Sequence, residues 1–332
     1  MRFLKFLARR VLHGIFVIWG VVTVVFLLRF LTPGDPTAAL VSPDAGQEVR
    51  DRLREQLNLD EPIHIQYFEY LTDLLVLDLG TSMEFPNITV AGWIFGPRLI
   101  KSIELAIAAT IVAVVIAIPL GVISARRRHE PADYGATLFS LVGISTPNFW
   151  LGIMLIILIA VPIGIIPTGE SPSHLFHEAF SILLLEQRLA PLGEWLRHMF
   201  LPAITLGTYF TALITRLTRS GMLEEIGKPY VKACQAKGLP QTLTLYKHVL
   251  RNTLIPIVTI LGLQLGTLIG GAVITEVVFE WQGLGQLLID RINARDWTMI
   301  QGIIIVIGVG FVVINTIVDA LYAYLDPRVI DE

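Results

Sequence analysis

The chain of 332 residues is strongly apolar, with 54% hydrophobic residues, 16% charged residues and a mean hydropathy of +0.67. A soluble domain usually carries about 25% charged residues, so this composition argues against a soluble protein. The net charge of −3 indicates little by itself, because the distribution of charge along the chain matters more, and the single cysteine, Cys234, excludes an internal disulfide.

Apolar runs of about 20 residues recur, and each is long enough to cross the hydrocarbon core of a bilayer as a helix. They predict an all-α polytopic membrane protein with six transmembrane helices. The first run follows basic residues, as in a signal peptide, but it is too long and lacks a small-residue cleavage site, so we interpret it as a retained span. The predicted spans are 11–31, 100–124, 136–161, 199–217, 254–278 and 299–325.

The segment 32–99 after the first span is polar and acidic, with eleven acidic against four basic residues. Two pieces of it, Gln47–Leu59 and Tyr67–Leu79, place apolar residues on one helical stripe. We therefore expect an ordered, helical extracytoplasmic loop. A second outer loop after the third span contains a predicted short amphipathic helix near Leu175–Leu189.

The distribution of lysine and arginine predicts the orientation. The N-terminal segment, the Arg126–Arg128 loop and the segment 218–253 are basic, whereas the alternate loops are acidic. Because cytoplasmic loops of membrane proteins carry the excess of lysine and arginine, both termini and 218–253 should be cytoplasmic. The domain plan is then 1–31 (cytoplasmic N-terminus and first span), 32–99 (outer loop), 100–325 (transmembrane domain of spans two to six, with the cytoplasmic loop 218–253) and 326–332 (cytoplasmic C-terminus).

Several kinds of chemistry are absent from the sequence. Gly227-Lys228 is followed by Pro229 and belongs to no phosphate-binding loop, and no paired-cysteine or His-Glu-x-x-His metal pattern occurs. His174 and His177 lack a third ligand nearby. The spans carry almost no ionisable residue at mid-depth, which counts against a proton- or sodium-coupled carrier. We therefore expect no catalytic residue, metal or cofactor on this chain.

The fifth span has small residues at regular spacing. Gly262, Gly266 and Gly270 recur every four residues and share one helix face, which lets another backbone approach closely. This face either packs within the subunit or contacts a second subunit across a pore, and both alternatives remain open. Gln264 and Thr267 are polar residues of the same span, and they either line a water-filled path or bond to a neighbouring helix. Trp281, in the following loop, is a third candidate for the translocation path.

The segment between the fourth and fifth spans is broken into pieces of helix. Pro229 suits the first turn of a short helix over Tyr230–Lys237, and Gly238 suits its left-handed C-terminal cap. Pro240 then suits the start of a second helix over Gln241–Leu250. Helix, glycine turn and helix form a compact knob, whose apolar residues need a surface to pack on. We interpret the knob as a docking surface for a cytoplasmic partner; the alternative is an ordinary solvated connection.

The knob resembles a known loop. Tyr230–Leu239, read as Tyr-Val-Lys-Ala-Cys-Gln-Ala-Lys-Gly-Leu, is similar to the cytoplasmic EAA loop of ABC importer permeases, in the form found in the dipeptide, oligopeptide and nickel permease family. Lys232 takes the place of the glutamate, and Cys234 that of the second alanine. Further matching motifs, which are specific to the family and weak on substrate, are Leu31–Pro36, Phe149–Gly152, His248–Pro256, Val278–Gly285 and Leu325–Arg328.

The resemblance implies a type I ABC importer permease in the inner membrane of a prokaryote, forming half of a translocation pathway. It implies a second homologous permease subunit, two ATPase subunits that bind ATP and Mg, and an extracytoplasmic solute-binding protein, besides membrane lipid and with no nucleic acid. The residues that would couple to the ATPases are Tyr230, Ala233, Ala236, Lys237 and Gly238.

The solute implied by the resemblance is a di- or oligopeptide. A nickel complex, glutathione or a sugar oligomer is the alternative within the family, and a carrier that is not driven by ATP is the competing class. The chain itself is not expected to be an enzyme, because ATP hydrolysis would belong to the partner subunits.

Overall fold

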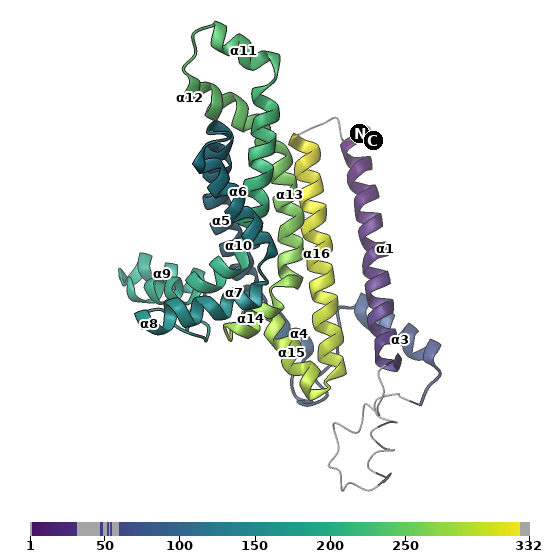
Figure 1. The fold of residues 1–332 in the computed structure, drawn as a ribbon. Helices are drawn as coiled ribbons and strands as arrows, with labels where there is room; N and C mark the ends of the chain where they lie inside the picture. Colours follow the sequence, from purple (N-terminus) through teal and green to yellow (C-terminus); the bar gives the residue numbers. More distant parts are fainter. Residues whose placement is uncertain (1, 32–46, 49–51, 53, 55–59, 326–332) are drawn as a thin grey trace.

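The computed structural model describes residues 2–31, 47–48, 52, 54 and 60–325, and within these ranges the chain is helical, with one isolated β-bridge between Thr81 and Thr89 (Figure 1). Four helices are long and apolar enough to cross a membrane, and six spans result if each of two bent helix pairs counts as one. This confirms the predicted all-α membrane fold. The long helices are α1 (Arg2–Leu31), α5 (Pro97–Arg126), α6 (Pro131–Ser145), α10 (Ala190–Ile226), α13 (Leu250–Gly271) and α16 (Trp297–Leu325).

Shorter helices lie toward the two ends of the bundle (Figure 1). At one end α11 (Pro229–Ala236), α12 (Gln241–Leu243) and the π-helical η3 (Thr244–Val249) follow α10, and α1 begins and α16 ends at this same end. Toward the other end are α3 (Ile63–Leu75), α4 (Val90–Ile94), α7 (Asn148–Leu155), η2 (Ile156–Ala160), α8 (Val161–Ile163), α9 (Phe176–Glu186), α14 (Val273–Val278) and α15 (Leu284–Ala294).

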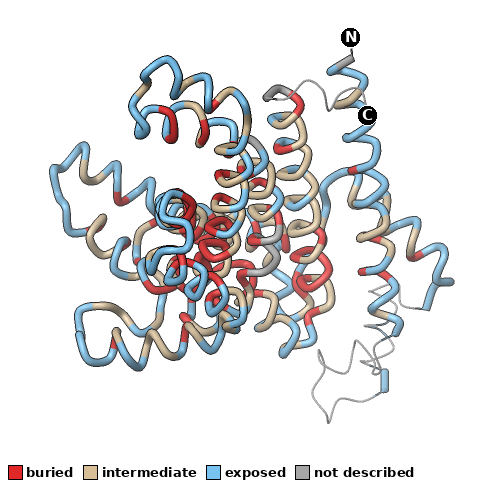
Figure 2. The backbone as a smooth tube through the Cα atoms, turned by 45° about the horizontal axis from the view of Figure 1, so that its top comes forward, coloured by how far each residue is buried: buried red, intermediate tan, exposed pale blue. Residues whose placement is uncertain are grey.

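The core of the bundle lies where α5 and α10 pack along one another. Buried residues gather in the middle of the molecule, and the outlying helices are mostly exposed (Figure 2). A Cβ at Gly207 of α10 would lie 2.8 Å from the Ala109 carbonyl oxygen of α5. A Cβ at Gly121 of α5 would lie 2.9 Å from the Thr215 carbonyl oxygen of α10. Small residues therefore let the two backbones approach closely, as in other membrane helix pairs.

The predicted third span, 136–161, is not one straight helix. α6 ends at Ser145, and the helices that follow from Asn148 are turned by 106°. Thr146 has extended backbone angles, and Pro147 stands at the N-cap of α7. The cause is steric, because a residue that precedes proline is disfavoured in the α region. After the break α7 packs on α14, where a Cβ at Gly152 would lie 3.1 Å from the Phe279 ring.

The predicted fifth span, 254–278, begins earlier than expected. The second helix of the knob, predicted over Gln241–Leu250, does not end at Leu250 but continues through η3 directly into α13, with a bend at Pro256. At the other end, a break at Ala272 separates α13 from the short α14. The knob is therefore continuous with a transmembrane helix on both of its sides, α10 before it and α13 after it.

The segments predicted to lie outside the membrane are partly helical, as expected. α3 starts earlier and ends earlier than the predicted Tyr67–Leu79, because Pro62 stands at its N-cap. The Tyr67 hydroxyl lies 2.6 Å from Thr23 Oγ1, so α3 is tied to α1. Most of the predicted Gln47–Leu59 helix lies outside the described residues. α9 confirms the helix predicted near Leu175–Leu189, whereas α15 was not predicted.

Candidate coupling site

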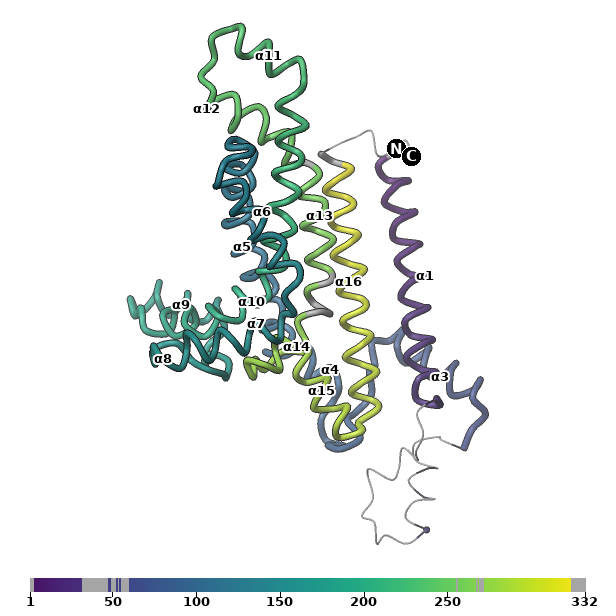
Figure 3. The backbone as a smooth tube through the Cα atoms, in the orientation of Figure 1, coloured from purple at the N-terminus to yellow at the C-terminus, as the bar shows by residue number. Residues whose placement is uncertain are grey.

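The knob is the continuation of the longest helix of the bundle. α10 runs through the molecule and emerges at Ile226, where Gly227 and Lys228 turn the chain into α11 (Figure 3). α11 and α12 project beyond the ends of the other helices (Figure 3). α11 begins with Pro229 in its first turn, as the sequence predicts, and ends at Ala236, one residue before the predicted Lys237.

The inner side of the knob packs on the bundle. Val231 of α11 is 3% exposed, and Leu245 and Val249 of η3 are also buried. They form one hydrophobic cluster with Val122 of α5 and Met222 of α10. Burial of apolar side chains is the main favourable term in helix packing, so this cluster fixes the knob against the ends of α5 and α10.

Polar contacts brace the base of the knob. The Glu225 carboxylate pairs with the Lys228 ammonium and accepts a 2.7 Å hydrogen bond from the Tyr230 hydroxyl. Asn252 Nδ2 of α13 donates to the same hydroxyl oxygen over 3.3 Å. Burial, together with the hydrogen bond to Glu225, raises the pKa of the Tyr230 phenol, and the hydrogen bond to Glu225 raises the pKa of Lys228. At neutral pH both groups therefore keep the protons that they donate.

The turn at Gly238 has the left-handed backbone that the sequence predicts. Its φ is +74°, its N–H donates to the Gln235 carbonyl over 2.9 Å, and the Leu239 N–H donates to the Cys234 carbonyl over 3.2 Å. This is a helix C-terminal cap of the kind that glycine favours. Apart from its immediate neighbours in the chain, no atom of the described residues lies within 4 Å of a Cβ built at Gly238. The turn is therefore open to the outside of the molecule.

The predicted coupling residues fall into two groups. Ala233, Ala236, Lys237 and Gly238 are exposed. Tyr230 is half-buried and turned inward to Glu225. The first four form the outer surface of the knob, whereas Tyr230 holds its base. A cavity of about 380 Å³ separates the knob from the end of α5, and Arg126, Arg128, Val231, Gln235 and Gln241 are among its lining residues.

The ion pair between Asp133, which is buried, and Arg219, which is half-buried, lies next to the knob and was not identified from the sequence. Asp133, in the first turn of α6, accepts hydrogen bonds from Arg219 Nε (2.6 Å) and Nη2 (2.8 Å) on α10. It also accepts from Ser124 Oγ (2.5 Å) and the His129 N–H (3.0 Å). The carboxylate thus joins the ends of α5, α6 and α10. Pro131 followed by Asp133 is a helix-start pattern that could have marked the position, though not its partners.

Of the predicted translocation-path residues, Trp281 lies in the core. Trp281 is fully buried, and its indole N–H donates to the Lys101 carbonyl over 3.0 Å. Gln264 is half-buried on α13. Thr267 lies on α13, but its side chain is outside the described residues. The assignment of the three residues to a translocation path stays a prediction.

The glycines of α13 lie along α16. A Cβ at Gly262 would clash with Val318, and one at Gly266 would lie 3.1 Å from the Phe311 ring. What Gly270 contacts lies outside the described residues. The close approach at Gly262 and Gly266 is thus made within this chain, and the assignment of the three glycines to a subunit interface stays a prediction.

A second buried carboxylate was also missed. Glu276 of α14 is 1% exposed and accepts hydrogen bonds from Ser102 Oγ of α5 (2.6 Å) and from the N–H groups of Gly285 (2.7 Å) and Gln286 (3.1 Å) at the start of α15. An acid inside the apolar run that ends the fifth span is a signal that the sequence offers. Among the described residues, no group of three or more histidine, cysteine, aspartate or glutamate side chains could hold a metal ion.

The chain matches two family models in succession. Residues 3–90 match "Binding-prot-dependent transport system membrane comp, N-term", and residues 117–331 match "Binding-protein-dependent transport system inner membrane component". The second match includes the knob and the helices on both sides of it.

Similar proteins align over almost the whole length. The dipeptide transport system permease protein DppB of Alkalihalophilus pseudofirmus is 38% identical over 98% of this chain and 99% of its own length. The oligopeptide transport system permease protein AppB of Bacillus subtilis and DppB of Escherichia coli K12 are each 36% identical over 98% of both chains. The chain therefore belongs to the family of binding-protein-dependent transport system inner membrane components, as a multi-pass permease component of an ABC transporter and not a catalytic subunit.

Proposed function

We propose that this permease imports di- or oligopeptides, delivered from outside by a solute-binding protein. The support is that relatives with 36–38% identity over nearly the full length are named dipeptide and oligopeptide permeases. A nickel complex, glutathione or a sugar oligomer is the alternative solute. The chain supplies half of the pathway and pairs with a second homologous permease subunit.

The solute is tested by uptake into proteoliposomes that contain the assembled transporter, with its binding protein and ATP supplied. A labelled dipeptide should accumulate only with ATP, and unlabelled di- and oligopeptides should compete with it. Glutathione, a nickel chelate and a sugar oligomer should not compete. Accumulation of one of these three without competition by peptides would assign the permease to that solute instead.

The knob is the proposed contact with two ATPase subunits, which bind the ATP and Mg that this chain does not. The main observation that supports this proposal is the exposed left-handed turn at Gly238. It lies at the tip of a knob whose inner side is packed on the bundle. The outer surface of the knob is exposed, and its inner side is packed on the bundle. A partner that displaces the outer surface would therefore also displace the helices packed on the inner side.

The path of that movement follows from the contacts. α10 is continuous with the knob and runs the length of the bundle, so it would move with the knob. The hydrophobic cluster of Val122, Met222 and Val231 would draw the end of α5 along. The Asp133–Arg219 ion pair would do the same for the start of α6. ATP-driven closure of the ATPase subunits would thus reorient three spans together.

The proposed orientation places the knob and both termini in the cytoplasm and the 32–99 loop outside. It rests on the positive-inside distribution. The placement of the start of α1, the end of α16 and the knob at one end of the bundle agrees with it (Figure 1).

The coupling role is tested by Gly238→Asp, with Gly164→Asp as its matched control. Both glycines have positive φ, +74° and +67°, and no atom lies within 4 Å of a Cβ at either. The backbone strain should therefore be similar at the two sites, on the order of 1 kcal/mol. Gly238→Asp should insert and pair with the second permease but lose ATPase binding and uptake, whereas Gly164→Asp should keep both.

The readouts are pull-down of the ATPase subunits and uptake by membrane vesicles. Equal ATPase binding by the two variants would show that the tip of the knob is not the contact. The knob would then be only a connection between two spans.

A further inference from the structure

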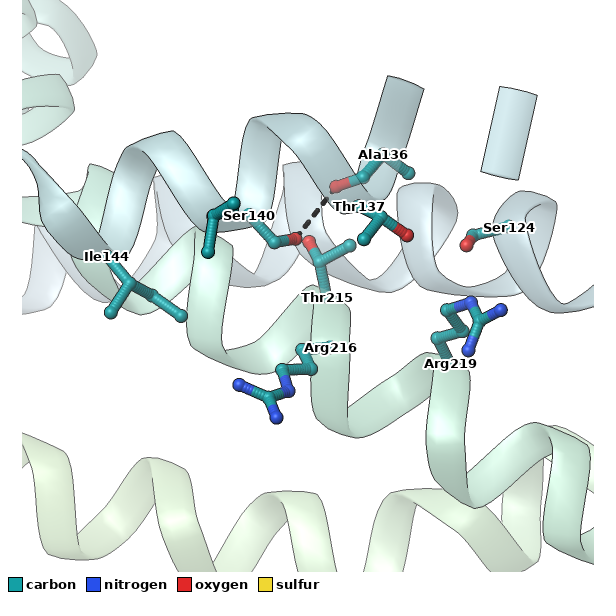
Figure 4. A pocket seen from close by; sticks show the side chains of 9 residues that line it. Ser124, Ala136, Thr137, Ser140, Ile144, Thr215, Arg216 and Arg219 are labelled. Atoms are coloured by element: carbon teal, nitrogen blue, oxygen red, sulfur yellow. Dashed lines mark hydrogen bonds between the residues drawn. The ribbon is translucent and has the colours of Figure 1, made fainter. Parts of the chain in front are cut away.

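A cavity of about 360 Å³ lies between α6 and α10, in the half of the bundle next to the knob. Figure 4 shows Thr137, Ser140 and Ile144 of α6 on one side of it, with Arg216 and Arg219 of α10 on the other. Ser124, Ala136, Leu141 and Thr215 complete the lining. The site lies apart from the outer surface of the knob, and of its lining residues the proposed coupling role uses only Arg219, through its ion pair with Asp133.

The two arginines of the cavity differ in their partners. Arg219 is neutralised by Asp133 through two short hydrogen bonds. Arg216, on the next turn of α10, is exposed and has no carboxylate within ion-pair distance among the described residues. Its guanidinium therefore brings an uncompensated positive charge to the cavity. A guanidinium offers a fork of N–H donors that matches the geometry of a phosphate or a carboxylate.

Besides the arginines and four hydroxyl side chains, the cavity has an apolar part, which continues onto an apolar face of α6. Leu141 and Ile144 line it, and Leu141 is 64% exposed. Leu138 and Val142 of the same helix are 62% and 55% exposed. A charged end and an apolar end thus lie next to each other, within helices that span the membrane. This combination matches an amphiphile whose anionic head meets Arg216 and whose hydrocarbon chain follows α6.

We propose that this cavity binds an anionic phospholipid of the cytoplasmic leaflet, with its phosphate on the Arg216 guanidinium and an acyl chain along Leu141 and Ile144. Arg126, the last residue of α5, and Arg128 line the neighbouring cavity beside the knob, so they add positive potential at the same end of the bundle. Basic pockets between transmembrane helices on the cytoplasmic side are favourable sites for anionic headgroups. The choice of leaflet rests on the proposed orientation.

The test is native mass spectrometry of the assembled transporter in detergent, with phosphatidylglycerol or phosphatidylcholine of identical acyl chains added. The wild type should retain phosphatidylglycerol in preference to phosphatidylcholine. Arg216→Gln should lower retention of phosphatidylglycerol about fivefold, the effect expected for one cation near an anionic lipid surface. Arg216→Lys should restore most of it, because it keeps the charge.

Arg127→Gln is the matched control. Arg127 is an exposed arginine at the same end of the bundle, 3.9 Å from Glu130, and it does not line the cavity. This variant should retain phosphatidylglycerol as the wild type does. Lipids are counted only on complexes that still carry all of their subunits, so loss of assembly is not mistaken for loss of lipid. Retention does not depend on transport, so its failure leaves the proposed solute untouched.

Three results would overturn the proposal. Equal retention by the wild type and Arg216→Gln would remove the role of the arginine. No preferential retention by the wild type would mean that another surface, such as the second permease subunit, fills the site. Displacement of phosphatidylglycerol by a free dipeptide, but not by its C-terminal amide, would assign the arginine to the carboxylate of the transported solute.

Discussion

At the scale of single residues, Glu276 is a buried carboxylate that joins two other helices of the bundle. Its carboxylate accepts from α5 through Ser102 and from the start of α15 through Gly285 and Gln286. Ser102 Oγ in turn accepts from the Leu284 N–H over 2.8 Å. A negative charge at a helix start is favourable, because the N-terminal N–H groups carry partial positive charge. The residue therefore fixes the position of α15 relative to α5.

Glu276→Gln should destabilise the folded permease by about 1–3 kcal/mol, because the amide keeps only one acceptor oxygen and turns its NH2 donor toward either the Ser102 hydroxyl or the N–H groups of α15. The measurement is the thermal unfolding midpoint of the purified protein in detergent. Glu280→Gln is the control, since Glu280 lies one turn further on and is exposed. A midpoint for Glu276→Gln that equals that of Glu280→Gln would contradict the capping role.

Whether a residue's role could be predicted from the sequence depends on how many residues separate it from its hydrogen-bond partner along the chain. Gly238 was predicted because its cap is made within a few residues, and the hydrogen bonds confirm it. Glu276 was missed because Ser102 lies 174 residues away. The hydrogen bond from the Trp281 indole to the Lys101 carbonyl was likewise not predicted, because the two residues are 180 positions apart in the sequence.

At the scale of elements, the knob can transmit movement from the ATPase subunits to the spans only if its base is held rigidly against the bundle. The Tyr230 hydroxyl links α11 to Glu225 at the end of α10 and to Asn252 of α13. Tyr230→Phe leaves the outer surface intact and removes only these bonds. We expect ATPase binding to persist and uptake to fall severalfold, because a hydrogen bond to a carboxylate contributes about 1.5–3 kcal/mol.

The control for this prediction is Tyr246→Phe, because Tyr246 of η3 is 52% exposed. ATPase binding is measured by pull-down and uptake in the same vesicles. Equal uptake by the two variants would mean that the base bonds do not contribute to coupling. Loss of ATPase binding in Tyr230→Phe would place Tyr230 on the contact itself.

The sequence predicted that the apolar runs form helices, but it did not predict at which proline the chain turns in a new direction. Pro119 and Pro202 stay inside α5 and α10, whereas the chain breaks and turns at Pro147. All three are prolines within apolar runs, so the hydrophobic pattern does not separate them. The difference is tertiary, because α7 after the break finds packing on α14 and α10. Such long-range contacts decide which proline ends a helix.

At the scale of the whole molecule, the orientation decides which surfaces meet which partners. In a background with Cys234 replaced by serine, Asp78→Cys should react with a membrane-impermeant maleimide added outside intact cells. Arg127→Cys should react only after the membrane is opened. Both residues are exposed, so accessibility does not limit labelling. The reverse pattern would invert the orientation, the ATPase contact and the leaflet assigned to the lipid.

The central claim is that the outer surface of the knob touches the ATPase subunits, and cross-linking tests it most directly. In the same cysteine-free background, Ala236→Cys carries a short thiol-reactive photo-cross-linker. Thr168→Cys carries the same reagent at an exposed position in the segment between α8 and α9, two helices toward the other end of the bundle (Figure 1). The account predicts a cross-link from position 236 to an ATPase subunit, with a yield that changes when ATP is added, and none from position 168. No ATPase cross-link from position 236 in a transporter that still takes up solute would contradict it.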